Sequence, residues 1–162
     1  MSSTALIDCP TALSEPEVRL LQEFARDRRV IEAGALLGYS TIKLAQVAAH
    51  VTSIDRHEGY SGLTLKRFMQ NIERSGFRHK ILPLVGDCFD ILPTLAGDFT
   101  FIDLTGTYED TMRALWSAPS SLMAVHDYHR VGCEGVALAV HECSWLRPIG
   151  RADTLLVMEH QT

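Results

Sequence analysis

The fold of this chain is decided by the stretch Val30-Ile31-Glu32-Ala33-Gly34-Ala35-Leu36-Leu37-Gly38-Tyr39-Ser40-Thr41. A short apolar run leads into two glycines four positions apart, and a helical pattern follows them. Gly34 and Gly38 allow a tight turn and a close approach of the backbone to a ligand. The helix that follows would offer its free N–H groups to an anion. The stretch therefore predicts a strand, a binding turn and a helix.

Strand-like and helix-like segments alternate along the rest of the chain. Short apolar strands separated by helices are typical of a parallel sheet covered on both faces, so we predict a doubly wound α/β fold. The predicted strands are Val30–Ala33, Val51–Asp55, Ile81–Val85, Phe99–Asp103 and Leu122–His126. The predicted helices are Tyr39–Ala49, Leu63–Ser75, Phe89–Leu95, Tyr108–Trp116 and Gly135–Cys143.

Both ends of this pattern carry an additional element. Ser14 and Glu17 form a capping-box pattern, which predicts an N-terminal helix over residues 14–28. Arg147–Ile149 and Thr154–Glu159 lie too close together for a helical crossover, so they predict an antiparallel hairpin around Gly150. We expect one domain over residues 1–162, with the sheet and its helices in residues 29–162.

The spacing of the glycines indicates which ligand the turn binds. A dinucleotide fingerprint that starts at Gly34 needs further glycines at positions 36 and 39, where this chain has Leu36 and Tyr39. A nicotinamide cofactor is therefore disfavoured. The next strand ends in Asp55, about twenty residues after the turn, where a carboxylate can accept hydrogen bonds from both ribose hydroxyls.

A second turn, Gly86-Asp87-Cys88, follows the third strand. It falls where an adenine ring would lie if the first turn binds a nucleoside. An equally good interpretation is that Asp87 caps the next helix. Both interpretations stay open on the sequence alone.

The motif E-x-G-x-x-x-G-Y-S resembles that of class I methyltransferases, especially the catechol O-methyltransferase-like branch. Further along, Ile54-Asp55-Arg56-His57, Phe101-Ile102-Asp103 and His126-Asp127-Tyr128 resemble the family of macrocin-type sugar O-methyltransferases. The resemblance implies a Rossmann-like methyltransferase sheet, S-adenosylmethionine as cofactor, often a divalent metal, and an alcohol or phenol as acceptor. The residues that we expect to bind the cofactor are Glu32, Gly34, Ala35, Gly38, Tyr39, Ser40, Asp55, Arg56, Asp87, Cys88 and Asp103.

One departure from the family affects catalysis. Relatives read F-I-D-G-x-H-x-Y, whereas this chain has Gly106 at the position of the histidine that serves as general base. The catechol branch has a lysine there. If the geometry is otherwise intact, Gly106→His should raise the rate of methyl transfer.

The carboxylates at two strand ends suggest a metal site. Asp103 and Asp127 could place two oxygens on one hard cation such as Mg²⁺. Alternatively, Asp103 contacts only the cofactor and Asp127 only caps a turn. Asp103, Asp127 and His126 are the candidate catalytic residues, and His126 is the favoured replacement base among the histidines because it precedes Asp127 at a strand end.

Composition narrows the partners and the compartment. Fifteen basic against twenty acidic residues give a formal charge of −5, which is atypical of a protein that binds nucleic acid. We expect no membrane span and no secretory signal at Met1–Asp8, and free thiols at Cys9, Cys88, Cys133 and Cys143, as in a cytoplasmic protein.

The sequence thus predicts an S-adenosylmethionine-dependent methyltransferase that acts on the hydroxyl of a small molecule, with or without help from a metal. The alternative is a non-catalytic module that binds the cofactor and has lost its general base. Because the chain is short, either the acceptor site is open or a second copy of the chain completes it in a homo-oligomer.

Overall fold

The computed structural model describes residues 13–58 and 63–161. These residues form a seven-stranded sheet with helices on both faces, as predicted. The strands are β1 (Arg29–Ala33), β2 (His50–Asp55), β3 (Ile81–Val85), β4 (Phe99–Ile102), β5 (Leu122–Val125), β6 (Leu146–Ala152) and β7 (Leu155–His160). The helices are α1 (Glu15–Ala25), α2 (Tyr39–Ala45), α3 (Thr64–Ser75), α4 (Cys88–Ile91), α5 (Tyr108–Ser117) and α6 (Glu134–Glu142), with 3₁₀ turns η2 (Arg78–Lys80) and η3 (Leu92–Thr94).

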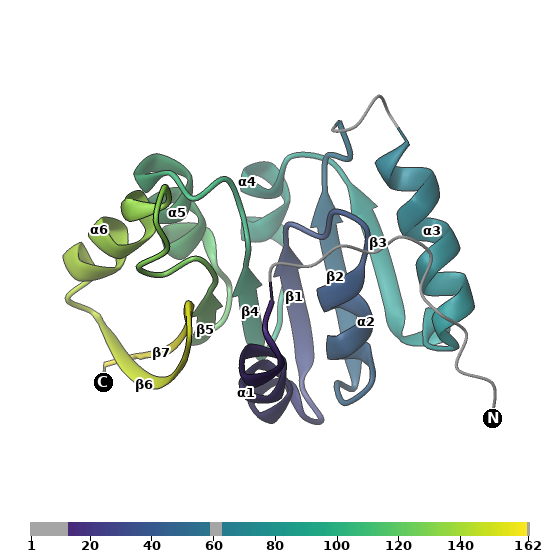
Figure 1. Ribbon diagram of the computed structural model, residues 1–162, viewed down its shortest axis with the longest axis horizontal. Helices are drawn as coiled ribbons and strands as arrows, with labels where there is room; N and C mark the ends of the chain where they lie inside the picture. The colour runs from purple at the N-terminus through teal and green to yellow at the C-terminus, as the bar shows by residue number, and fades with distance from the viewer. Residues whose placement is uncertain (1–12, 59–62, 162) are drawn as a thin grey trace.

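The strand order across the sheet is β3-β2-β1-β4-β5-β7-β6 (Figure 1). The strands β1 to β5 pair in parallel, whereas β7 pairs antiparallel with both β5 and β6. The chain reverses its direction of travel through the sheet after β3, so that β1 and β4 are neighbours at the centre. Ligands in open α/β sheets bind beyond the carboxyl ends of the strands at such a reversal.

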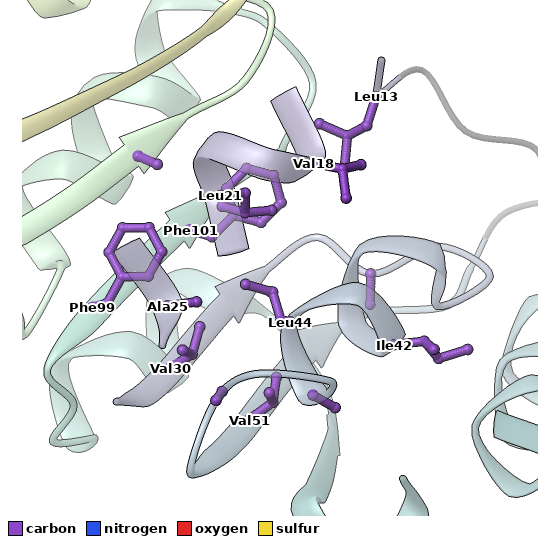
Figure 2. Packing of buried hydrophobic residues seen from close by; sticks show 14 of the residues in the cluster. Leu13, Val18, Leu21, Ala25, Val30, Ile42, Leu44, Val51, Phe99 and Phe101 are labelled. Carbon is purple, nitrogen blue, oxygen red and sulfur yellow. The ribbon is translucent and has the colours of Figure 1, made fainter. Parts of the chain in front are cut away.

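Each face of the sheet has its own apolar core. One core joins α1, α2 and α3 to the sheet, and the other joins α4, α5 and α6 to it. In Figure 2, Leu21 and Ala25 of α1 lie near Phe99 and Phe101 of β4, and Leu44 of α2 lies between the strands and α1. The two cores explain why the central strands β1, β4 and β5 are almost entirely buried, whereas most residues of β3 and of the edge strand β6 are not.

The N-terminal helix begins as its sequence predicts. Ser14 accepts a hydrogen bond from the backbone N–H of Glu17, and the Glu17 carboxylate accepts one from the N–H of Ser14. The helix ends at Ala25, three residues earlier than predicted. Glu17 is buried, which is unusual for a capping-box residue.

The predicted C-terminal hairpin is present, but the turn was placed wrongly. The chain reverses at Asp153 and Thr154, and Gly150 lies inside β6 beside a register shift between Pro148 and Gly150. A Cβ at residue 150 would lie 3.1 Å from the Phe24 ring of α1, so this glycine allows the helix to pack closely on the strand.

Three other local predictions differ from the structure. The helix predicted over Phe89–Leu95 is a single α-helical turn followed by η3, because Pro93 cannot donate the next helical hydrogen bond. The second helix ends at Ala45 and not at Ala49. Helical spacing with Met112 and Leu115 predicts that Trp116 lies in the core, but Trp116 is 69% exposed, and its ring packs on that of Trp145 at a tilt of 45°.

Two predictions concern covalent state and membrane spans. Cys88, Cys133 and Cys143 are free thiols, as predicted, whereas Cys9 and the segment Met1–Asp8 lie outside the described residues. Within residues 13–58 and 63–161, no helix has both the length and the apolar character that crossing a bilayer requires.

Candidate functional site

The glycine turn after β1 is built around two backbone conformations that favour glycine. Gly34 has a φ of 93°, and a Cβ there would lie 1.9 Å from the carbonyl oxygen of Asp103. Gly38 has a φ of 89° and precedes the first residue of α2. A Cβ at residue 38 would lie 3.0 Å from the Phe68 ring of α3. Both glycines are therefore required by the geometry of the turn.

Asp55, at the end of β2, fixes the shape of that turn. One carboxylate oxygen accepts hydrogen bonds from the N–H groups of Ala35 (2.9 Å) and Leu36 (2.8 Å). The other accepts one from the N–H of His57 at 2.7 Å. Partial burial alone would raise the pKa of Asp55, but these three hydrogen bonds hold it below its ordinary value. Asp55 is therefore an ionised carboxylate at the carboxyl edge of the sheet.

Glu32 lies beneath the turn and is fully buried. Its carboxylate accepts hydrogen bonds from the hydroxyls of Thr41 (2.5 Å) and Ser53 (2.7 Å), so it joins β1 to α2 and β2. Burial raises its pKa to about 7, and the hydroxyl hydrogen bonds only partly oppose that rise. In this position Glu32 supports the turn from inside.

A cavity of about 570 Å³ opens at the carboxyl edge of the sheet. Of the residues predicted to bind the cofactor, all line this cavity except Glu32 and Gly38. Those that line it are Gly34, Ala35, Tyr39, Ser40, Asp55, Arg56, Asp87, Cys88 and Asp103. Residues far apart in the chain thus meet at one hollow, although their contacts with a cofactor stay a prediction.

The second turn, which also lines the cavity, has a structural role that the sequence left open. Asp87 caps α4 by accepting a hydrogen bond from the N–H of Phe89 at 2.9 Å, and it also pairs with Arg56. The Phe89 hydrogen bond and the Arg56 guanidinium keep the pKa of Asp87 below its ordinary value. Asp87 thus caps α4 and lines the cavity at the same time.

Sequence reasoning missed several residues that line the same cavity, namely Leu13, Phe89, Thr105, Asp110 and Arg113. The Arg113 guanidinium of α5 lies 4.0 Å from the centre of the Phe89 ring of α4, so a cation–π contact joins the two helices. Phe89 directly follows the second turn, and this position in the sequence could have indicated that Phe89 lines the cavity.

Asp103, His126 and Asp127 converge at the ends of β4 and β5. One ligand atom from each residue lies within 4.8 Å of the other two. The Nδ1 atom of His126 is 3.2 Å from an Asp103 carboxylate oxygen and 3.5 Å from an Asp127 oxygen. Asp103 also lines the cavity, whereas His126 and Asp127 do not. The cluster therefore adjoins the cavity through Asp103.

Carboxylates outnumber the cationic groups around this cluster. Burial alone would lower the pKa of His126, but the neighbouring carboxylates of Asp103, Asp127 and Glu17 raise it above the ordinary value. Outside the cluster, Arg130 donates a 2.7 Å hydrogen bond to Asp127. The surplus of carboxylates makes the cluster attractive to a cation.

The packing around Gly106 bears on the expected effect of Gly106→His. Gly106 has a φ of 77°, and a Cβ there would lie 2.8 Å from the sulfur of Cys133. A histidine would be strained in its backbone and would collide with Cys133. Gly106→His is therefore expected to distort the loop, so the intact geometry that the predicted rise in rate requires is not met.

An open sheet of this strand order, with a glycine turn after β1 and a carboxylate after β2, defines a Rossmann-like nucleotide-binding fold. A family model described as a methyltransferase domain matches residues 31–128. This is more than half of the chain, and the chain belongs to the methyltransferase-domain family.

Relatives and solved structures agree with this family. The chain is 38% identical over 87 residues to a catechol O-methyltransferase of Mycobacterium tuberculosis, covering 52% of this chain and 39% of that protein. It is 29% identical over 134 residues to the O-methyltransferase hkm8 of Aspergillus hancockii, covering 78% of this chain and 49% of that protein. The O-methyltransferase TomG of Streptomyces achromogenes, solved in complex with S-adenosylmethionine, superposes with a TM-score of 0.68 at 21% identity, over 93% of this chain and 82% of that chain.

The chain thus spans less than half the length of these two curated relatives. The likeness to TomG establishes a shared fold. The resemblance to class I methyltransferases, including the catechol branch, is confirmed at the level of the family.

The burial of Glu32 gives a testable dependence of stability on pH. A carboxyl whose pKa is raised from 4.5 to about 7 by folding stabilises the fold only while it is protonated, so this contribution is lost as the pH rises through about 7. The free energy of unfolding of Glu32→Gln should therefore increase relative to that of the wild type as the pH is raised from about 5 to about 8, by up to about 3 kcal/mol. Urea unfolding at the two pH values measures the gain.

The matched control is Glu23→Gln, which removes an exposed carboxylate of α1. It should show no pH-dependent gain. Parallel curves for Glu32→Gln and the wild type would mean that Glu32 is ionised at no cost in the folded protein.

Proposed function

We propose that this chain binds S-adenosylmethionine and transfers its methyl group to a hydroxyl of a small molecule. The observation that carries the proposal is the single cavity in which the glycine turn, Asp55 and Asp103 meet at the carboxyl edge of the sheet. Membership of the methyltransferase-domain family and the O-methyltransferases among its relatives support the same conclusion.

The cavity offers a partner for each part of such a cofactor. The turn and the hydroxyl of Ser40 would hold the methionine part, and the ionised Asp55 would accept hydrogen bonds from the ribose hydroxyls. Cys88, Phe89 and Arg113 would surround the adenine. Asp103, which joins the cavity to the carboxylate cluster, then lies on the side where the methyl group leaves.

The residues of the cluster fit a divalent cation. An ion with bonds of about 2.1 Å holds neighbouring octahedral ligands about 3.0 Å apart. The distances of 3.2 and 3.5 Å from His126 Nδ1 to the two aspartates are close to this spacing. His126 is thus a third ligand candidate beside Asp103 and Asp127. An imidazole in the set favours Mn²⁺ over Mg²⁺.

The cluster supplies an alternative to the missing general base. A bound cation lowers the pKa of a coordinated hydroxyl, and it would do the same for an acceptor. Asp103 and Asp127 would orient that cation beside the cavity. Methyl transfer is an in-line displacement, so orientation of the two reactants contributes much of the rate. A weak base then suffices.

The second candidate is a module that binds the cofactor without turning it over. The observation that favours it is the packing of Gly106 against Cys133, which leaves no room for the family's base. The acidic cluster next to the cavity favours the enzyme. Turnover of the methyl donor with catechols and other hydroxylated acceptors, in the presence of Mn²⁺, distinguishes the two candidates.

Cofactor binding is tested by calorimetry with S-adenosylmethionine, its demethylated product and NAD. We expect binding of the first two and none of NAD. Asp55→Ala should weaken binding by about 1.5–3 kcal/mol, because charge-assisted hydrogen bonds are lost; this is a roughly 10- to 150-fold rise in Kd. Asp98→Ala is the control, since Asp98 is an exposed carboxylate that also accepts a backbone hydrogen bond, from Arg29. Tight NAD binding without a response to the methyl donor would refute the proposal.

The cation is tested with two variants of opposite expected effect. Asp127→Asn removes a charged ligand and should weaken Mn²⁺ binding while it leaves cofactor affinity nearly unchanged. Arg130→Gln removes the guanidinium that occupies an Asp127 oxygen and should strengthen Mn²⁺ binding. Calorimetry with Mn²⁺, and methyl transfer with and without a chelator, measure both effects. If both variants bind Mn²⁺ like the wild type, the cation site is not at this cluster.

A further inference from the structure

Beneath the candidate cation site lies a third carboxylate, which the family resemblance does not include. Glu17 belongs to α1 and is 1% exposed, and His126 is 3% exposed. The Nε2 atom of His126 lies 3.7 Å from a Glu17 carboxylate oxygen. Among the described residues, this nitrogen has no hydrogen-bond partner. The imidazole is therefore placed between Glu17 on one side and the two aspartates on the other.

Glu17 is held in place from two directions. One oxygen accepts a 2.7 Å hydrogen bond from the N–H of Ser14, at the start of α1. The other accepts hydrogen bonds from the N–H (2.8 Å) and the hydroxyl (2.7 Å) of Thr154, in the turn between β6 and β7. The start of α1 and the turn between β6 and β7 thus hold the carboxylate in place, and neither α1 nor this turn contributes a residue to the lining of the cavity.

A neutral imidazole carries one proton, so a histidine that binds a cation through Nδ1 must carry that proton on Nε2. Histidine ligands usually donate this second N–H to a carboxylate or carbonyl, which fixes the ring and its tautomer. In this protein the group that faces Nε2 is Glu17.

We propose that Glu17 is a positioning residue: it accepts the Nε2–H of His126 and so keeps Nδ1 free to bind the cation together with Asp103 and Asp127. This inference rests on the proposed cation site. It gives the buried member of the capping box a role that capping does not need, because a capping glutamate at the surface would cap the helix equally well. In the cation-bound protein this 3.7 Å separation would have to shorten to a hydrogen bond.

The affinity for Mn²⁺ tests the proposal on the whole protein. Glu17→Gln should weaken Mn²⁺ binding about 10- to 100-fold, the usual effect of losing such an outer partner. Thr154→Val is the matched control, because it removes a hydroxyl from the same carboxylate without changing what faces His126. It should lower the stability to urea and leave Mn²⁺ affinity within about twofold of the wild type.

Nitrogen NMR of the Zn²⁺-loaded wild type provides a second readout that needs no variant to fold. We expect the His126 proton on Nε2, protected from exchange with solvent, and Nδ1 without a proton. A proton on Nδ1, or Mn²⁺ affinity in Glu17→Gln equal to that of the wild type, would overturn the role of Glu17 and leave the cation site intact. A wild type that binds neither Mn²⁺ nor Zn²⁺ would overturn both.

Discussion

At the end of β1, the backbone of Gly34 approaches the carbonyl of Asp103 so closely that a Cβ would lie 1.9 Å from the oxygen. This contact holds the glycine turn directly against the end of β4. The turn lines the part of the cavity assigned to the cofactor, and Asp103 belongs to the acidic cluster assigned to the cation. Because this close approach and the 2.9 Å hydrogen bond from the N–H of Asp103 to the carbonyl of Ala33 set their separation, the two halves of the site are held in a fixed relation by the centre of the sheet.

Two buried carboxylates, Glu32 and Glu17, and the half-buried Asp55 support this arrangement from below and from the side. Glu32 joins β1, α2 and β2 through hydroxyl groups, and Asp55 holds the N–H groups of the turn itself. Glu17 connects α1 and the C-terminal hairpin to His126. Buried charges are costly unless they are hydrogen-bonded. Their presence in this small domain is consistent with a site whose geometry is set before any ligand binds.

The sequence predicted most of the fold, because the glycine turn, the alternation of elements and the capping box are local patterns. It misplaced the hairpin turn, since Gly150 reflects the packing of Phe24 and not a reversal of the chain. It grouped the residues expected to bind the cofactor by strand end, and the structure brings most of them to one cavity, while their contacts with a cofactor stay a prediction. It could not reveal that Glu17 faces His126 or that Gly106 packs on Cys133, because both contacts join distant segments. Such contacts leave no periodic signal.

In the function proposed above, a cofactor and a cation lie side by side at the carboxyl edge of the sheet. The most direct measurement is the anomalous diffraction of crystals grown with Mn²⁺ and the demethylated cofactor. We expect a manganese peak within bonding distance of Asp103, His126 Nδ1 and Asp127, next to a cofactor whose ribose contacts Asp55. A cofactor bound in the cavity with manganese elsewhere, or a cavity that excludes the cofactor, would contradict it.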